Sequence, residues 1–124
     1  MTDQIRTETL TITTVGGAGV ATGSATMANT PFGALLDIYL DYHASCPNTA
    51  DVTVTEPVFG TIVVKSNNAT DIRIAPVITC VDATATAVSA YMNVPLDGGP
   101  LTVSIDQADA LTACLVATIR WLSW

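Results

Sequence analysis

The chain has 124 residues, with 11 acidic and four basic side chains and a net charge of −7. This charge excludes nucleic acid as a direct partner, because binding to phosphates depends on Lys and Arg displacing counterions. The length fits one domain, so we expect a single domain over residues 1–124.

Short alternating segments separated by turn residues predict about nine strands and an all-β fold. We expect an antiparallel β-sandwich of jelly-roll or immunoglobulin-like type, with a short N-terminal arm at residues 1–6. The candidate strand segments are 7–14, 20–28, 35–43, 51–55, 59–65, 71–75, 77–81, 83–94, 101–105 and 113–124.

The segment 35–43 has the clearest pattern, because apolar and polar residues alternate from Leu36 onward. One face is predicted to be buried and the other to be exposed, which fixes the register. Asp37 and Asp41 are then solvated and about 13 Å apart, which is too far for a glycosidase pair. The predicted buried residues are Leu36, Ile38, Leu40 and Tyr42, and the exposed ones are Asp37, Tyr39, Asp41 and His43.

The glycines at positions 16, 17 and 19 predict a turn, and a hairpin between the two segments that flank it. The apolar run at 77–81 is typical of a sandwich core. The segment 83–94 is rich in Ala and permits a helix, but its alternating Thr and Val favour a strand.

Asp106 is predicted to cap one short helical turn over 107–111, the only helix expected. The first and last strands are long enough to be sheet edges, and uncovered edges pair readily with a neighbouring subunit.

No catalytic site is predicted. The single histidine, His43, precedes Ser45 and Cys46 so closely that a nucleophile, a base and an orienting group cannot be assembled, and an exposed histidine at a strand end is the simpler interpretation. The glycine-rich turn lacks the Lys and the helix of a nucleotide-binding loop.

Three cysteines, Cys46, Cys80 and Cys114, are widely spaced and odd in number. We expect reduced, mostly buried thiols rather than a disulfide scaffold, and neither a metal site nor a cofactor. The residues around Asp3 and Glu8 do not read as a secretory leader, and no apolar run would span a membrane. We therefore expect synthesis in a cytoplasm and no membrane partner.

Charged residues are only 12% of the chain, about half the usual share, which suits a subunit packed against neighbours. A compact apolar monomer is the alternative. Trp121 and Trp124 lie near the chain end and are predicted to anchor such a contact, although Trp121 could instead complete the core. The interface candidates are Ile5, Arg6, Tyr39, Phe59, Trp121 and Trp124.

Four segments resemble small virion proteins of tailed bacteriophages: TLTITTVGGAGVATGSAT, IYLDYHAS, TADVTVTE and LTVSIDQADAL. The resemblance covers about residues 8–119 and implies a non-enzymatic structural subunit. The role it implies is a cement or decoration protein on the outer capsid surface, bound to the major capsid protein and associated as a dimer or trimer.

In this hypothesis, the arm or an edge strand pairs with the major capsid protein. Two alternatives stay open. One is a tail, neck or fibre component. The other is a carbohydrate-binding β-sandwich module, although no single loop of the sequence holds both aromatic residues and carboxylates.

Overall fold

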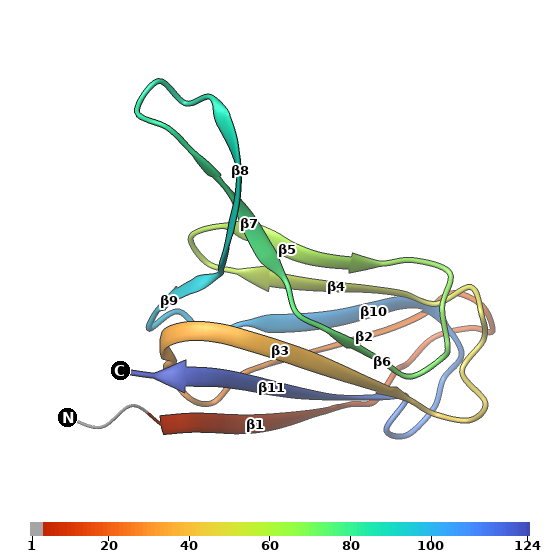
Figure 1. Ribbon diagram of the computed structural model, residues 1–124. Helices are drawn as coiled ribbons and strands as arrows, with labels where there is room; N and C mark the ends of the chain where they lie inside the picture. Colours follow the sequence, from red (N-terminus) through yellow and green to blue (C-terminus); the bar gives the residue numbers. More distant parts are fainter. Residues whose placement is uncertain (1–3) are drawn as a thin grey trace.

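The computed structural model describes residues 4–124, and this part of the chain consists of strands joined by turns (Figure 1). It holds eleven strands where about nine were expected. They are β1 (Gln4–Ile12), β2 (Ala21–Thr26), β3 (Phe32–Tyr42), β4 (Asp51–Glu56), β5 (Gly60–Lys65), β6 (Ile72–Ile74), β7 (Val77–Val81), β8 (Ala87–Asn93), β9 (Pro95–Asp97), β10 (Thr102–Ala108) and β11 (Leu115–Ser123).

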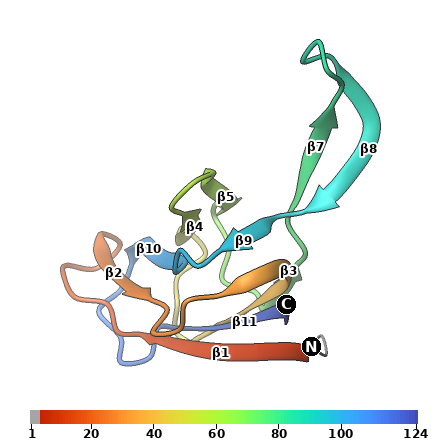
Figure 2. The same ribbon diagram turned by 90° about the vertical axis from the view of Figure 1, so that its left-hand side faces the viewer.

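Two antiparallel sheets form the body of the molecule. One has the order β1-β11-β3-β6, with β9 also paired to β3, and the other has the order β2-β10-β4-β5. Their inner faces meet in one apolar core, so the predicted antiparallel β-sandwich is confirmed. The two views show the layered body, with a two-stranded hairpin, β7–β8, standing apart from it (Figures 1 and 2).

The core follows the alternation of side chains along each strand. In β11 every second residue is buried, and β4 and β10 contribute matching residues from the facing sheet. Core residues of these three strands include Val52, Val54, Val103, Ile105, Leu115, Ala117, Ile119 and Trp121.

The predicted register of the segment 35–43 is wrong at Leu36, because β3 contains a β-bulge there. Asp37 pairs with Arg120 and Leu35 pairs with Trp121, so Leu36 has no partner opposite it. The inward face therefore changes parity at the bulge. Leu35 is completely buried where Leu36 was expected to be, and Leu36 is only partly buried.

The N-terminal predictions need two corrections. Residues 4–6 belong to β1 and are not an arm, while residues 1–3 lie outside the described part of the chain. The predicted hairpin across the glycine turn is also wrong, because β1 pairs with β11 and β2 pairs with β10 in the other sheet. Only a single bridge, Val15 to Thr22, links the two segments.

The helical turn predicted over 107–111 is absent from residues 4–124. The strand β10 runs through Asp106, which pairs with Asp51 of β4. Burial of Ile105 and Ala108 keeps this segment on the core, and Gln107 adopts a positive φ of 51° at a register shift. Inter-strand pairing thus outweighs the capping tendency of Asp106.

The prediction that the last strand is a sheet edge is wrong, because β11 lies between β1 and β3. The N-terminal strand β1 is an edge, as expected. The two terminal strands pair with each other along their whole length, from Gln4 opposite Ser123 to Ile12 opposite Leu115. The ends of the chain therefore lie at the same end of the sandwich (Figure 1).

The strand predicted over 83–94 begins only at Ala87, after a turn at 82–86. It pairs with Val77–Val81 to form the projecting β7–β8 hairpin. The prediction that 77–81 lies in the core is therefore wrong, since its residues alternate between exposed and half-buried.

Candidate functional site: an aromatic groove and a projecting hairpin

A groove lies at the end of the sandwich where Gln4 of β1 pairs with Ser123 of β11. Its first recess encloses about 340 Å³ and is lined mainly by apolar groups, with Phe59 and Trp124 as its aromatic walls. Trp124 is 61% exposed and Phe59 is 43% exposed, so both rings present surface to a ligand. Two carboxylates, Glu56 and Asp97, complete the lining. We call this surface, with the recess on the other side of Trp124, the Trp124 groove.

Glu56 shapes one wall of this recess. Its Oε2 accepts hydrogen bonds from the backbone amides of Val58 (2.7 Å) and Phe59 (2.6 Å), which holds the β4–β5 turn closed. The residue is only 2% exposed, and no donor within residues 4–124 reaches its Oε1. A buried carboxylate oxygen without a donor is costly, which marks Glu56 as more than a turn residue.

Two glycines place Asp97 at the opposite wall. A Cβ on Gly98 would lie 2.6 Å from Cζ of Phe32, and a Cβ on Gly99 would lie 2.7 Å from Cγ of Pro57. Gly98 also has a φ of 87°, which favours glycine. The turn after β9 therefore fits between Phe32 and Pro57 only because these positions lack side chains.

A second recess of about 290 Å³ lies on the other side of Trp124. It is more polar, and its lining includes Arg6, Asn29, Thr30 and Phe32. The backbone amide of Trp124 donates to the carbonyl of Phe32 (3.3 Å), which fixes the chain end between the two recesses. The Trp124 indole is thus shared by an acidic, apolar recess and a polar one.

Four of the six interface candidates line the groove: Arg6, Phe59, Trp121 and Trp124. Trp121 is 2% exposed and contributes to the core, so its predicted role as a surface anchor is wrong. Its position opposite Leu35 at the bulge directs it inward. Ile5 is exposed on the edge strand β1.

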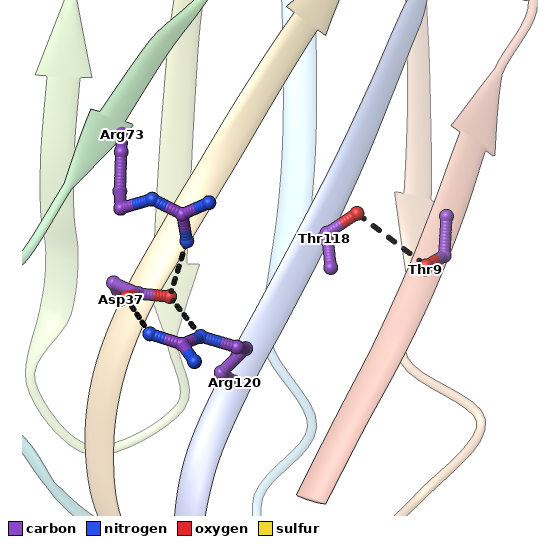
Figure 3. Close-up of polar contacts among 5 residues, drawn as sticks. All are labelled: Thr9, Asp37, Arg73, Thr118 and Arg120. Carbon is purple, nitrogen blue, oxygen red and sulfur yellow. Dashed lines mark hydrogen bonds and ion pairs between the residues drawn. The ribbon is translucent and has the colours of Figure 1, made fainter.

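Tyr39 lies in a separate cluster on the outer face of the first sheet. The guanidinium of Arg73 lies 5.1 Å from the Tyr39 ring centroid and 3.2 Å from a carboxylate oxygen of Asp37. Arg120 donates two further hydrogen bonds to Asp37, at 2.9 and 2.5 Å (Figure 3). These bonds, chiefly that from Arg120, lower the pKa of Asp37. The prediction that Asp37 is solvated is wrong, because its side chain is buried.

Threonines extend this outer face toward the sheet edge. Thr9 of β1 lies opposite Thr118 of β11, with 3.4 Å between their hydroxyl oxygens (Figure 3). The face is polar and its charges are compensated by internal pairing, which makes it a less distinctive ligand surface than the groove.

The β7–β8 hairpin is the most exposed apolar element. Every residue of β8 is exposed, including Tyr91 at 69% and Met92 at 46%. Asp82 at the tip is the only charged residue between Arg73 and Asp97. The hairpin joins the body at its root, where the Asn93 side chain donates to the carbonyl of Leu35 (2.8 Å).

Asp82 organises the hairpin tip. Its Oδ1 accepts hydrogen bonds from the amides of Thr84 (2.9 Å) and Thr86 (3.0 Å), and from the Thr84 hydroxyl (2.7 Å). The Thr84 side-chain hydrogen bond, followed by the Thr86 and Thr84 backbone bonds, lowers the pKa of Asp82. The tip is therefore an ordered turn, although β8 is exposed along its whole length and, of the hairpin strands, Ile78 alone packs against the core cluster of residues 4–124.

His43 has a structural contact, since its Nδ1 accepts a hydrogen bond from the backbone amide of Ser45 (3.0 Å). The thiols of Cys46 and Cys114 are free and buried, with 3.8 Å between their sulfur atoms. Burial, together with Cys114, raises the pKa of Cys46 to about 12. Cys80 is half-buried in the hairpin strand β7.

Residues 4–124 hold no group of three or more His, Cys, Asp and Glu side chains placed to bind a metal ion. The same residues form no helix of the length and apolarity needed to cross a membrane.

No family model matches the sequence, and no curated protein matches it either. Among solved structures, the chain is similar to the C-terminal CBM6 of LamC, a marine laminarinase from Zobellia galactanivorans. The identity is 7%, the match covers 94% of this chain and 99% of that one, and the TM-score is 0.40. It is also similar to an exo-β-1,3-galactanase from Phanerochaete chrysosporium, at 12% identity over 98% of this chain, with a TM-score of 0.35. The chain spans about a third of the length of the galactanase, since the match covers 30% of it.

The groove itself was not predicted, because its residues come from five separate parts of the sequence. The expectation that no single loop holds both aromatic residues and carboxylates is wrong, because Glu56 lies three positions before Phe59 at the β4–β5 turn. Nothing in the sequence joined that pair to Asp97 or Trp124, which β9 and β11 bring to the same end of the sandwich.

Proposed function

We propose that this chain is a non-enzymatic structural subunit of a tailed-phage virion that decorates the outer capsid surface by binding the major capsid protein. The observation that carries an assembly role is the β7–β8 hairpin, in which every residue of β8 and every second residue of β7 are exposed. An isolated two-stranded hairpin is at best marginally stable in water, so this one gains most from packing on a partner. The assignment of this subunit to a phage virion is based on the sequence resemblance.

The charge distribution supports this role. The hairpin is nearly uncharged, as the centre of a protein interface usually is. The chain as a whole carries −7, which disfavours contact with packaged DNA and favours a place outside the shell. The edge strand β1, with Ile5 exposed, offers a second contact for a homo-oligomer.

The number of copies per purified particle tests the proposal. A decoration protein that binds every capsid subunit is present at a copy number comparable to that of the major capsid protein. A dozen copies or fewer would instead indicate a tail, neck or fibre component. Absence from the particles would contradict the proposal.

A hairpin variant tests which surface makes the contact. The double substitution Tyr91→Ser and Met92→Ser removes two exposed apolar side chains and should reduce incorporation into particles about tenfold or more, as loss of interface anchors does. The matched control is Val20→Ser, which changes an equally exposed apolar residue in the β1–β2 loop. Equal incorporation of both variants would contradict docking through the hairpin.

A further inference from the structure

The Trp124 groove has a chemistry that the assembly role does not use. Ligand sites in proteins are typically concave and mostly apolar, with a few polar groups that fix orientation. The first recess meets this description, with Phe59 and Trp124 as walls and Asp97 as an exposed acceptor. Glu56 also lines it, but its Oε1 is buried and has no donor within residues 4–124.

The second recess adds donors on the other side of the same indole. Arg6 and Asn29 supply N–H groups, and Phe32 supplies another aromatic surface. A ligand that spans both recesses therefore needs apolar faces to lie against the rings and several hydroxyls that both donate and accept. A chain of linked pyranose rings has both properties, since each ring carries C–H faces and a rim of hydroxyl groups.

Charge decides between a sugar and a basic side chain as the occupant. Two carboxylates and an aromatic ring would also suit a cation. However, Arg6 lines the recess on the other side of Trp124, so a cation bound against the indole would be repelled from that side. An acidic sugar is disfavoured by Glu56, Asp97 and the net charge of −7. A neutral sugar avoids both costs.

We propose that the Trp124 groove binds a neutral oligosaccharide, with the Trp124 indole between two consecutive sugar rings. The ring in the first recess lies against Phe59 and donates a hydroxyl hydrogen bond to Asp97. The ring in the second recess accepts hydrogen bonds from Arg6 and Asn29. This site is separate from the β7–β8 hairpin, so one molecule can be held by its hairpin while its groove remains open to glycans.

The test uses the purified chain titrated with cellohexaose, laminarihexaose and xylohexaose, with hexalysine as the cationic probe, followed by calorimetry and by tryptophan fluorescence. At least one hexasaccharide should bind and change the tryptophan emission, to which both the exposed Trp124 and Trp121, in the lining of the second recess, contribute. Trp124→Ala should weaken that binding about tenfold or more, as loss of an aromatic anchor does.

Two further variants keep the result interpretable. Phe59→Ala should also weaken sugar binding, whereas Val20→Ser should leave it unchanged, because Val20 lies in the β1–β2 loop at the other end of both strands from Arg6 and Asn29. Near-UV circular dichroism of Trp121 checks that each variant is folded.

Three outcomes would overturn the proposal: no binding of any hexasaccharide by the folded chain, equal binding by Trp124→Ala and wild type, or binding of hexalysine at the groove in place of sugars. None of these outcomes bears on copy number in particles, so the failure of this inference and the failure of the assembly role are distinguishable.

Discussion

Strands β4 and β7 are alike in length and pairing and opposite in environment. Both are short and pair with the next strand along the chain, but β4 alternates apolar with polar residues whereas β7 is apolar except for Thr79. Val52 and Val54 of β4 are completely buried, whereas Val77 and Val81 of β7 are more than half exposed. The comparison shows that an apolar strand does not by itself specify the surface on which it packs. The body buries one face of β4, whereas of β7 it contacts Ile78, and in the proposed assembly the capsid partner covers the rest.

The first way to test this contrast is a matched pair of substitutions. Val103→Ala in the core should lower the free energy of unfolding by about 2 kcal/mol, because it removes buried methyl groups and leaves a cavity. Val88→Ala in the hairpin should lower it by less than about 0.5 kcal/mol, since that side chain is exposed. Urea denaturation measures both. Equal effects would mean that the hairpin packs on the body of its own chain.

The outer-face ion cluster should contribute next. Asp37→Asn should cost about 1–2 kcal/mol at pH 7, less than a fully buried pair would, because both arginines are roughly half exposed. The pKa of Asp37 is lowered in the folded protein, so its stabilisation is present above the unfolded value of about 3.9 and is lost as the pH falls through the folded pKa.

Urea titrations of wild type and Asp37→Asn at pH 7 and pH 3 measure this effect. The two stability curves should converge at the lower pH. Asp41→Asn, on the same strand but exposed, is the control and should show no such convergence. A difference that persists unchanged through acid pH would show that the arginines do not stabilise the Asp37 carboxylate.

Thiol labelling separates the two regions directly. Cys80 in the hairpin should react with a maleimide at least about 100-fold faster than Cys46 and Cys114, which need an opening of the core. Burial also keeps Cys46 protonated, because its pKa is raised to about 12. Mass spectrometry of digested samples over time gives the rates. Labelling of all three thiols at one rate would contradict the separation.

The smallest expected effect concerns the hairpin tip. Asp82→Ala removes the acceptor for the amides of Thr84 and Thr86, so these amides should exchange with solvent faster, while the unfolding midpoint of the body stays unchanged. Amide exchange followed by NMR measures this. A lowered midpoint would show that tip and body unfold together.

Local patterns predicted much of the fold. Alternation in 36–42 and 51–55 predicted strands that the structure contains. The bulge at Leu36 could not be predicted, because it exists only in the pairing of β3 with β11. The buried state of Asp37 was missed for the same reason, since Arg73 and Arg120 are distant in sequence and reach it only across the sheet.

The candidate sites were harder to predict than the strands. Phe59 and Trp124 were selected as exposed aromatics, but the groove that joins them depends on the close packing of Gly98 on Phe32 and of Gly99 on Pro57. The apolar run 77–81 predicted a core strand. This prediction failed because composition does not show whether the next strand folds back onto the body. Here β8 pairs with β7 and carries both away from it (Figure 2).

Hydrogen exchange of the β7–β8 amides, in the isolated chain at a concentration where it is monomeric and in purified particles, tests the central claim most directly. In the isolated chain these amides should exchange far faster than those of β4 and β10, because β8 is exposed along its whole length and, of the hairpin strands, Ile78 alone packs against the core cluster of residues 4–124. In the particle they should become protected to a degree similar to that of the body. Rapid exchange of the hairpin in both samples would contradict the proposal that it is the element by which this protein binds the shell.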